Sequence, residues 1–513
     1  MNESPDVLVV GLGPVGATAA ALLANAGLSV TAIDRDGDVY ALPRAVATDD
    51  DALRVWQTVP GLAEEISKDL IRDPEVIYTS VGGRPIAEVE PSLRKSPSGH
   101  PSLALFHQPT LEKSIRSAAE RCGAELATGF ELIRWEQDLD GVDAQIRDVD
   151  SGEVTALRAK WMIGADGASS EIRKALGGNF SGATFEEPWV VLDAKVDEES
   201  ESGPERCEFH CNPERPTVTM PMPGGRRRWE FMFLAGDSEE EMLSQDRIAQ
   251  MVAGAGGARP AEVERALVYT FHARLADKWG EGRVFIMGDA AHLTPPFAGQ
   301  GMNTGVRDAG NLWWKIAAVE REVAGQEILD TYQAEREPHA KAMIALAVRL
   351  GGIVQTPKRS VARVRDGFLR TFQAIPGMKA WTRRMGWKPA SVIGKGFLKC
   401  GRRRPRSREG LLIPSPEVIT LDGPVLLDDL IGARFALVSE EVDSLGRVDP
   451  KIKALAKEFG AVEVIIGDRA ESVGDEPKAE RVVFEDPSGT LQDWLKGRTA
   501  LVRPDRYVYG TWR

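Results

Sequence analysis

The clearest pattern of hydrophobic and polar positions stands at the start of the chain. Residues 7–10 are all apolar, which predicts a strand buried on both faces. A glycine-rich turn follows, a helical pattern runs to Gly27, and residues 30–33 form a second apolar run that ends at Asp34. This order predicts a βαβ unit. Residues 7–33 also lack charge over a length that could span a membrane, but their glycines and the acidic residues before them favour the buried unit.

Further along the chain, the same periods predict helices and strands in alternation. Helical spacing of apolar residues appears at 54–68, at 110–121 and from about residue 303 to 390, and buried strands are expected at 161–164 and 284–287. After residue 410 the pattern is α/β again. The basic stretch 395–408 contains Gly and Pro and is interpreted as a linker rather than as a nucleic-acid tail.

Residues 190–275 change to a β-rich pattern. Two alternating apolar triplets flank a Pro-Gly-Gly turn within it: Val218, Met220 and Met222 before the turn, and Trp229, Phe231 and Phe233 after it. We expect a hairpin with one apolar face that walls a pocket. The three arginines beside this turn, 226–228, are expected to be solvated rather than to bind a substrate carboxylate.

Composition adds limits to this picture. The 513 residues exceed the ~250–300 at which one hydrophobic core stops growing, so two or three domains are expected. With 64 basic and 77 acidic side chains the net charge is −13, which disfavours nucleic acid or an anionic membrane as a partner of the whole molecule. Four scattered cysteines are too few for a disulfide framework, and this favours a cytoplasmic location.

A glycine motif in the first turn carries the strongest chemical signal. Gly11, Gly13 and Gly16 form GxGxxG between the predicted strand and helix. The first glycine allows a tight turn, the second leaves room for a pyrophosphate, and the third lets helix and strand pack closely. The pyrophosphate then lies at the helix N-terminus, and Asp34 is placed to accept hydrogen bonds from a ribose. This predicts a dinucleotide site without separating FAD from NAD.

Two later motifs favour FAD. Asp166-Gly167 follows the strand at 161–164 and opens a helix, and Asp289 follows the strand at 284–287. A carboxylate at a strand end can bind a ribityl hydroxyl. The glycine-rich turn at 299–303 offers N–H donors to a flavin pyrimidine and to its negative charge when reduced. Each motif alone could be a tight turn with a capping aspartate, so the argument depends on their occurring together.

Taken in order, the three motifs resemble the fingerprints of the class A flavoprotein monooxygenases, the para-hydroxybenzoate hydroxylase-like family. The resemblance extends to Pro43-Arg44-Ala45, to Gln108 and to GMNTGVRDAGNLWWKI from Gly301. Within this family the chain most resembles the hydroxylases of 3-(3-hydroxyphenyl)propionate, over nearly its whole length. The matching segments are PRAVATDDDALRVWQ, RRWEFM, TYQAEREPHAKAMI and VRPDRYV.

The resemblance implies an enzyme in which NADH or NADPH reduces FAD, and dioxygen supplies the oxygen that hydroxylates a phenolic ring beside its hydroxyl group. The product would be a catechol, and no metal is required. Two alternatives stay open: a hydroxylase of the same class that acts on a polyketide or antibiotic aromatic, and a non-catalytic flavin-binding redox sensor. A homodimer is a further open expectation, whereas nucleic acid and membrane are not expected as partners.

The resemblance also implies roles for individual residues. FAD contacts are expected from Gly11, Gly13, Gly16, Asp34 (where the family more often has Glu), Arg35, Arg44, Gln108, Asp166, Gly167, Asp289, Gly299, Gln300, Gly301, Met302 and Asn303. For catalysis, the candidates are a backbone carbonyl at Pro295 or Pro296, beside the isoalloxazine ring, and His210 as a base. The substrate pocket is expected to include Met220, Phe231 and Phe297.

The expected fold is α/β. It combines a Rossmann-like FAD-binding domain with a helical extension (1–75, 106–180 and 282–400), an interleaved β-rich substrate domain (76–105 and 181–281), and a C-terminal linker with a thioredoxin-like domain (401–513). No cysteine lies beyond Cys400, so the last domain is expected to be structural or oligomer-forming rather than active in dithiol chemistry.

A few conspicuous residues are expected to have structural roles. Cys207, His210 and Cys211 are spaced somewhat like a metal cluster, but strand alternation places His210 opposite the two cysteines, so no metal site is expected. His292, Trp313 and Trp314 are expected to pack in the protein interior rather than to act on a ligand.

Overall fold

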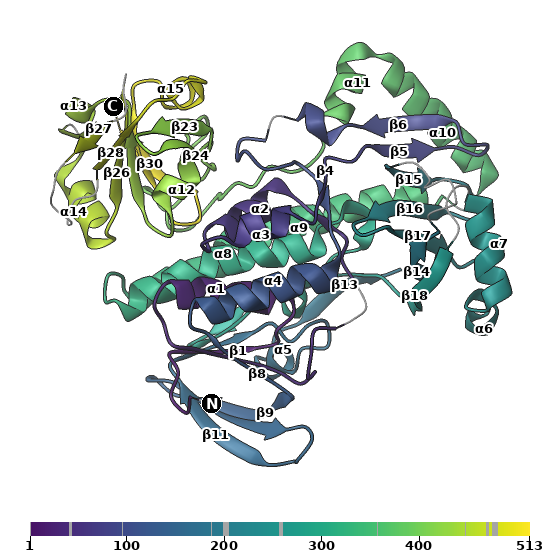
Figure 1. The fold of residues 1–513 in the computed structure, drawn as a ribbon, viewed down its shortest axis with the longest axis horizontal. Helices are drawn as coiled ribbons and strands as arrows, with labels where there is room; N and C mark the ends of the chain where they lie inside the picture. The colour runs from purple at the N-terminus through teal and green to yellow at the C-terminus, as the bar shows by residue number, and fades with distance from the viewer. Residues whose placement is uncertain are drawn as a thin grey trace.

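The computed structural model describes residues 2–40, 44–94, 96–185, 187–197, 205–255, 260–356, 358–446, 448–467, 471–473 and 481–512. Pro43 of the Pro43-Arg44-Ala45 motif lies outside these residues. Figure 1 shows a C-terminal unit and a large, mostly antiparallel sheet on opposite sides of two long helices, α8 (Gly301–Glu320) and α9 (Thr331–Val354). The predicted α/β class is confirmed.

The first unit is built on a six-stranded sheet. In sheet order its strands are β20 (Gly280–Glu281), β21 (Val284–Ile286), β12 (Trp161–Gly164), β1 (Val7–Val10), β2 (Val30–Asp34) and β8 (Glu125–Thr128). All but the β20–β21 pairing are parallel. β1 is buried along its whole length, as its unbroken apolar run predicts. The predicted βαβ unit at the N-terminus is confirmed, with α1 (Pro14–Asn25) as its helix.

Helices cover this sheet and bring distant segments to it. α1 packs against both α4 (Gln108–Arg121) and α8 (Figure 1). The single helix expected at 54–68 is two helices, α2 (Asp50–Gln57) and α3 (Leu62–Ser67). The helix breaks there because Pro60 lacks a backbone N–H and Gly61 adopts φ 72°, a left-handed conformation that ends helical geometry.

The second unit is a seven-stranded sheet assembled from three parts of the chain. In order, its strands are β18 (Pro260–Tyr269), β14 (Trp189–Val196), β17 (Arg226–Met232), β16 (Thr217–Met222), β15 (Cys207–His210), β5 (Val76–Thr79) and β6 (Pro85–Val89). The short helices α6 (Glu239–Met242) and α7 (Gln245–Ala255) pack on one face. α10 (Arg359–Ala374) and α11 (Pro376–Arg383) pack on β6, so this part of the helical segment borders the second sheet.

The predicted hairpin at 218–233 forms, but its single apolar face is wrong. Met220 pairs with Arg228, so these two side chains lie on the same face of the sheet. Trp229 and Phe231 point to the other face and pack beneath α6 and α7. The cause is register: pairing that is offset by one residue moves every side chain of a strand to the opposite face.

The C-terminal unit has its own mixed six-stranded sheet. The strands are, in order, β27 (Glu471–Val473), β28 (Arg481–Phe484), β26 (Val462–Ile466), β25 (Ala436–Ser439), β29 (Thr499–Val502) and β30 (Val508–Trp512). A hairpin of β23 (Glu417–Thr420) and β24 (Gly423–Leu426) and the helices α12 (Leu427–Ile431), α13 (Val442–Gly446), α14 (Pro450–Glu458) and α15 (Thr490–Leu495) complete it. The α/β pattern expected after residue 410 is confirmed, while the thioredoxin-like assignment stays a prediction.

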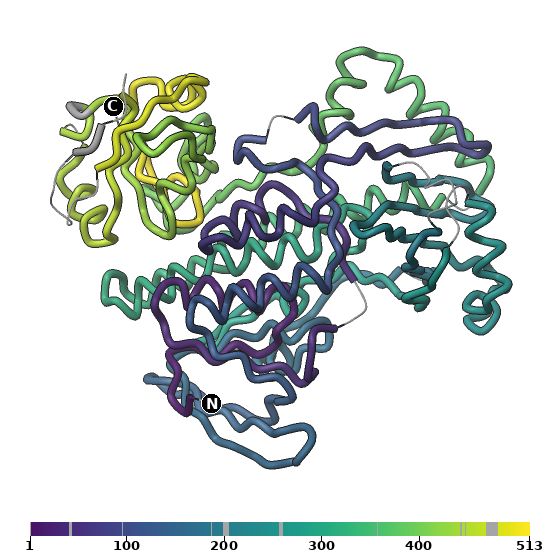
Figure 2. Tube along the Cα trace, viewed as in Figure 1, coloured from purple at the N-terminus to yellow at the C-terminus, as the bar shows by residue number. Residues whose placement is uncertain are grey.

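Buried charge ties the C-terminal unit to the first unit. The Arg54 guanidinium on α2 binds both carboxylate oxygens of Asp428, at 2.5 and 2.9 Å. Arg503 donates to both oxygens of Glu335 on α9, at 3.0 and 2.7 Å. Figure 2 shows the chain leaving the long helices and crossing to this unit through the segment after α11. The two units are therefore docked and not merely tethered.

Smaller elements complete the first unit. They are β3 (Ala47–Thr48), β4 (Ile71–Arg72), β7 (Ala104–Leu105), β9 (Phe130–Gln137), β10 (Val142–Asp148), β11 (Val154–Ala159), α5 (Glu171–Ala175), β13 (Phe180–Thr184), β19 (His272–Ala276) and β22 (His292–Leu293). Among the helices of the described ranges, none is both long and apolar enough to cross a membrane.

Candidate functional site

A cavity of about 450 Å³ lies where the first unit meets the second sheet. The first unit contributes the turn after β1, the turn after β12 and the segment from Met287 to Met302. The second sheet contributes side chains from β18, β14, β17, β16, β15, β5 and β6, and Met385 and Trp387 follow from the segment after α11. The three sequence motifs thus border one cavity.

The GxGxxG turn has the space that a bound pyrophosphate needs. A Cβ atom on Gly11 would overlap the carbonyl oxygen of Ala165, and one on Gly16 would overlap the carbonyl oxygen of Gly11. A Cβ on Gly13 would meet nothing within 4 Å. Gly11 and Gly16 are therefore required by the protein's own packing, whereas Gly13 leaves open space at the N-terminus of α1, within the cavity wall.

Asp34 is the last residue of β2, and its side chain holds the GxGxxG turn through a hydrogen bond. Its Oδ2 accepts the backbone N–H of Leu12 at 2.7 Å, and its Oδ1 accepts the N–H of Asp36 at 3.0 Å. The side chain of Arg35 is 76% exposed and faces Asp36 at 3.8 Å. Asp34 is thus close to the glycine turn but partly used by it, and Arg35 points to solvent.

Asp166 divides its two oxygens between the fold and the interior. Oδ2 accepts the N–H groups of Glu171 and Ile172 at 2.9 and 3.2 Å and so caps α5. Oδ1 is buried and has no hydrogen-bond partner. Burial raises the pKa of this carboxyl against the lowering effect of its hydrogen bonds. A buried acceptor without a donor, next to Gly167 in the cavity wall, fits a ligand that brings a hydroxyl or N–H group.

Gln108 holds the segment that carries Arg44. Its Oε1 accepts the backbone N–H groups of Arg44 and Ala45, at 2.6 and 2.7 Å. Arg228 on β17 donates to the Arg44 carbonyl at 3.0 Å. The Arg44 guanidinium itself lies over the ring of Tyr40, 4.7 Å from its centroid, and borders the cavity. Gln108 therefore acts on the cavity mainly by fixing the position of Arg44.

The turn from Pro295 to Asn303 forms the floor of the cavity. Gly299 adopts φ 59°, which a glycine accepts without strain. Asn303 anchors the turn from beneath, since its Nδ2 donates to the carbonyls of Ala47 and Gly299 at 3.1 and 2.7 Å. Asp289 is exposed where it borders the cavity, and desolvation by the surrounding cavity walls raises the pKa of its carboxyl.

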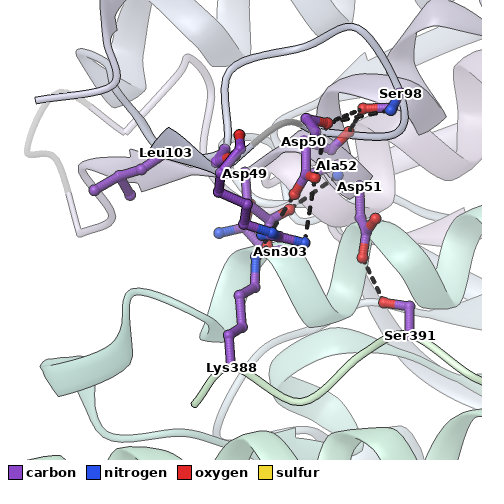
Figure 3. A network of polar contacts seen from close by, with 12 residues as sticks. Asp49, Asp50, Asp51, Ala52, Ser98, Leu103, Asn303, Lys388 and Ser391 are labelled. Atoms are coloured by element: carbon purple, nitrogen blue, oxygen red, sulfur yellow. Dashed lines mark hydrogen bonds and ion pairs between the residues drawn. The ribbon is translucent and has the colours of Figure 1, made fainter. Parts of the chain in front are cut away.

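A buried polar network supports this floor (Figure 3). Arg307 donates to Gln300 Oε1 at 2.8 Å and to Asp49 Oδ2 at 3.0 Å, and Lys388 donates to the same Asp49 oxygen at 2.8 Å. Burial alone would raise the pKa of Asp49, but Arg307 and Lys388 outweigh it and hold that pKa well below its usual range. Lys388 directly follows Trp387, so the network joins the floor to one side of the cavity wall.

Two of the residues predicted for catalysis or for the substrate pocket lie away from the cavity. His210 faces Thr79 and Glu208, with Nδ1 3.2 Å from Thr79 Oγ1 and Nε2 3.4 Å from Glu208 Oε2. Its neighbours Cys207 and Phe209 border the cavity instead, because side chains alternate along a strand. Phe231 packs on the opposite face of the second sheet.

The other residues predicted for catalysis or for the substrate pocket lie at or next to the cavity. Met220 and Phe297 border it, and Phe297 packs edge-on against Trp189 and Phe271 with ring centroids 5.7 Å apart. Pro296 borders the cavity, and its carbonyl accepts the N–H of Gly299 at 2.8 Å. Pro295 is adjacent to it in the same turn.

The residues expected to pack do so. His292 is fully buried, and its Nε2 lies 2.7 Å from Asp308 Oδ2. Trp313 and Trp314 are buried, and Trp314 contacts the ring of Phe435 in the C-terminal unit at 5.4 Å. Cys211 is buried with Sγ directed at the Phe209 carbonyl. Within the described ranges no group of three His, Cys, Asp or Glu side chains is placed to hold a metal.

The expectation of a solvated arginine turn is wrong. Arg228 is buried, and its Nε and Nη2 donate to the two oxygens of Asp193 at 2.6 and 2.7 Å. Arg227 is also buried and donates to Thr219 at 2.8 Å. Only Arg226 is partly exposed. Arg228 binds the Asp193 carboxylate on β14 and Arg226 pairs with Glu264 on β18, two strands that the local sequence does not place beside these arginines.

Sequence reasoning missed several residues of the cavity wall. They are Tyr78, Phe209, Arg228, Glu230, Arg265, Tyr269, Phe271, Met385 and Trp387. The sequence did indicate that two of these residues could face the cavity. In RRWEFM, Arg228 and Glu230 alternate with Trp229 and Phe231, so the two pairs lie on opposite faces of the strand and one pair faces the cavity.

Comparison with protein families gives two matches. Residues 4–347 match the model described as FAD binding domain, and residues 410–513 match the model described as HcaD C-terminal domain. The first match covers more than half of the chain, including the three motifs that border the cavity.

Individual relatives match along the whole chain. A 3-(3-hydroxy-phenyl)propionate/3-hydroxycinnamic acid hydroxylase of Burkholderia cenocepacia is 35% identical over 98% of this chain and 93% of its own. One from Mycobacterium sp. is 33% identical over 98% of this chain and 88% of its own. Among solved structures, the flavin-dependent monooxygenase PieE aligns with TM-score 0.81 at 22% identity over 99% of this chain and 96% of its own. Aklavinone-11 hydroxylase aligns with TM-score 0.75 at 23% identity over 100% and 96%. At these identities the structural likeness shows the fold.

Proposed function

Since the chain belongs to the family of FAD-binding aromatic hydroxylases, we propose that it hydroxylates a phenolic acid such as 3-(3-hydroxyphenyl)propionate, ortho to the phenol, to give a catechol. NADH or NADPH is the reductant and dioxygen the oxygen donor. The observation that supports this proposal most directly is that the three glycine/aspartate turns and a wall rich in aromatic residues border one cavity of about 450 Å³.

In this proposal the first unit supplies the FAD ligands. Gly13 leaves space for the pyrophosphate at the N-terminus of α1, Gly11 and Gly16 allow the close packing of this turn, and Asp34 lies at the end of β2 for the adenosine ribose. Arg44, held by Gln108, brings a cation to the cavity edge. The unpaired Oδ1 of Asp166 and the open carboxylate of Asp289 can accept hydroxyl groups. Arg35 contributes charge only from outside, because it points to solvent.

FAD, when bound, supplies the electron transfer and the dioxygen activation that no amino-acid side chain provides. The turn of Gly299, Gln300, Gly301 and Met302 borders the cavity, and the first N–H groups of α8, which have no carbonyl partner within the helix, begin at Gly301. Asn303 and Arg307 keep this turn in place. The protein's task here is to hold fixed dipoles where charge develops, so that no reorganisation is needed during reaction.

The substrate ring fits the apolar wall formed by the second sheet. Tyr78, Phe209, Met220, Phe297 and Trp387 surround that part of the cavity and keep water from it. For the phenolic hydroxyl, the backbone carbonyls of Pro295 and Pro296 are the candidate acceptors in the turn. Pro296 borders the cavity, and its carbonyl keeps a second lone pair beside the one that accepts the Gly299 N–H. His210 is a poor candidate for a base, since it lies on the far side of β15.

The C-terminal unit serves docking rather than dithiol chemistry in this proposal. No cysteine follows Cys400, and the unit is joined to the first by the Arg54–Asp428 and Arg503–Glu335 pairs. A homodimer and a cytoplasmic location are part of the proposal. Sedimentation equilibrium of the holoenzyme tests the dimer, and fractionation of cells that express a tagged chain tests the location.

Turnover tests the function. Purified enzyme with FAD is given NADH or NADPH and 3-(3-hydroxyphenyl)propionate, and the pyridine nucleotide consumed is compared with the catechol and hydrogen peroxide formed. We expect near-stoichiometric catechol. Rapid peroxide release without catechol would exclude this substrate, and a panel of polycyclic phenols then tests the antibiotic-type alternative. Bound FAD without substrate-stimulated oxidation of either nucleotide would favour the redox sensor.

A further inference from the structure

The cavity wall is charged at one end and apolar at the other. The second sheet runs in the order β18-β14-β17-β16-β15-β5-β6. At β16, β15 and β5 its contribution to the wall is apolar or aromatic, with Met220, Phe209 and Tyr78. At β17 and β18 it is charged, with Glu230 and Arg265 in addition to Arg228. A ligand that extends along this wall must combine an apolar ring with a polar end.

Arg265 is the unusual residue of the charged end. It is 4% exposed, yet its Nε and Nη1 atoms have no hydrogen-bond partner. The carboxylate that it faces, Asp193, lies 3.6 Å from Nη1 and already accepts two hydrogen bonds from Arg228. The ring of Tyr269 lies below the guanidinium at 5.3 Å. Buried N–H groups without acceptors are costly, and in native proteins they commonly indicate a missing partner.

The charge balance of this cluster favours an anion as that partner. Arg228 and Arg265 are two cations that share one carboxylate, Asp193. Glu230 stands 3.9 Å from Arg228, and burial raises the pKa of its carboxyl, which moves it toward the neutral form. Arg265 therefore has no carboxylate to itself, because Asp193 already accepts two hydrogen bonds from Arg228 and the Nε and Nη1 atoms of Arg265 lack an acceptor. Guanidinium groups bind carboxylates strongly in such surroundings.

We propose that Arg265 binds the carboxylate of the aromatic acid substrate, with the ring lying toward the apolar end at β16, β15 and β5. This inference rests on the proposed function, because it assigns a polar end to that substrate. It makes Arg265 the residue that selects acids over neutral phenols. A phosphate of the pyridine nucleotide has the same anionic chemistry, so the experiment must separate the two sources.

Binding without turnover gives the cleanest test. The flavin absorbance of the FAD-loaded enzyme is titrated with 3-phenylpropionate, which has no phenol to hydroxylate, and with its neutral amide. The wild-type enzyme should prefer the acid by about 10- to 150-fold, the range of one charge-assisted hydrogen bond. Arg265→Gln should abolish this preference by weakening only the acid, and Arg265→Lys should recover part of it. Arg226→Gln is the matched control, because Arg226 pairs with Glu264 and lies outside the cavity wall.

Other outcomes overturn the inference. If the wild-type enzyme binds the amide as tightly as the acid, Arg265 has no carboxylate to recognise, whatever the variants do. Equal weakening of acid and amide in Arg265→Gln would indicate a structural role. A selective rise in the KM for NADH or NADPH would assign the cation to the nucleotide. Because 3-phenylpropionate needs no turnover, acid-selective binding would survive even if the chain hydroxylates none of the phenols tested, which separates this inference from the proposed function.

Discussion

Gly13 and Gly16 lie three residues apart in one motif, yet the structure predicts opposite consequences for the same substitution. Gly13 has φ −62° and ψ 177°, which any residue adopts, and a Cβ there meets no protein atom within 4 Å. Gly13→Ala should therefore leave the stability of the FAD-free protein within about 1 kcal/mol of wild type, since lower entropy of the unfolded chain offsets a slightly poorer helix N-cap.

The effect on FAD should be large. The new methyl group occupies the open space at the N-terminus of α1 and moves the pyrophosphate away from at least two charge-assisted N–H hydrogen bonds. At about 1.5–3 kcal/mol each, this loss amounts to roughly 3–6 kcal/mol, or about 10²- to 10⁴-fold in the dissociation constant of FAD. Gly16→Ala differs, because its Cβ overlaps the Gly11 carbonyl and forces α1 away from β1, so it should destabilise the FAD-free protein itself.

Two measurements separate these cases. Urea unfolding followed by circular dichroism reports the free energy of unfolding of each FAD-free variant, and quenching of FAD fluorescence reports the dissociation constant. If Gly13→Ala binds FAD within about threefold of wild type, the pyrophosphate lies elsewhere. If Gly13→Ala lowers the free energy of unfolding as much as Gly16→Ala does, Gly13 is not in open space.

Three further predictions follow from buried charge and thiols. Arg54→Met removes the hydrogen bonds from Arg54 to Asp428, which keeps Arg506 as a partner, so the change should cost about 1.5–3 kcal/mol of docking free energy; limited proteolysis between the units reports this as faster cleavage, and unchanged cleavage would contradict it. Arg503 and Lys315 lower the pKa of Glu335 to about 2 against the effect of burial, so its contribution to stability is complete above pH 4.5 and is lost as pH falls toward 2; Glu335→Gln should flatten the pH dependence of the melting temperature in that range. Burial raises the pKa of the Cys207 and Cys211 thiols to about 12, so brief alkylation at pH 8 followed by mass spectrometry should label the exposed Cys400 first, and rapid labelling of Cys207 would refute this.

Much of the fold could be predicted because its signals are local. An apolar run of four residues, a glycine turn and a helical pattern specify the N-terminal βαβ unit within about thirty residues, and the structure confirms it. The strands at 161–164 and 284–287 were readable in the same way. The predicted helix at 54–68 was wrong, since Pro60 and Gly61 interrupt it, and both residues were visible beforehand.

In the candidate site, too, the locally encoded turns could be predicted, whereas the wall formed by the second sheet could not. The glycine and aspartate turns could be assigned to one site from sequence because each follows a strand, and the carboxyl ends of neighbouring parallel strands meet at one sheet edge. The wall of the second sheet could not be assigned in this way. Whether Met220 shares its face with Phe231 or with Arg228 depends on cross-strand register, which the two strands do not encode separately.

By itself, then, the amino-acid sequence determined the βαβ unit, the three glycine and aspartate turns that border the cavity, and the class of cofactor, because short-range periodicity and turn chemistry act within a few residues. Only the tertiary structure decided that Arg228 and Arg265 share Asp193, that Lys388 reaches Asp49, and that His210 and Phe231 face away from the cavity. Arg228 and Asp193 are 35 positions apart in the sequence, and Lys388 and Asp49 are 339 positions apart. Their energies depend on burial and on the pairing of charges in space, and neither is a property of the local sequence.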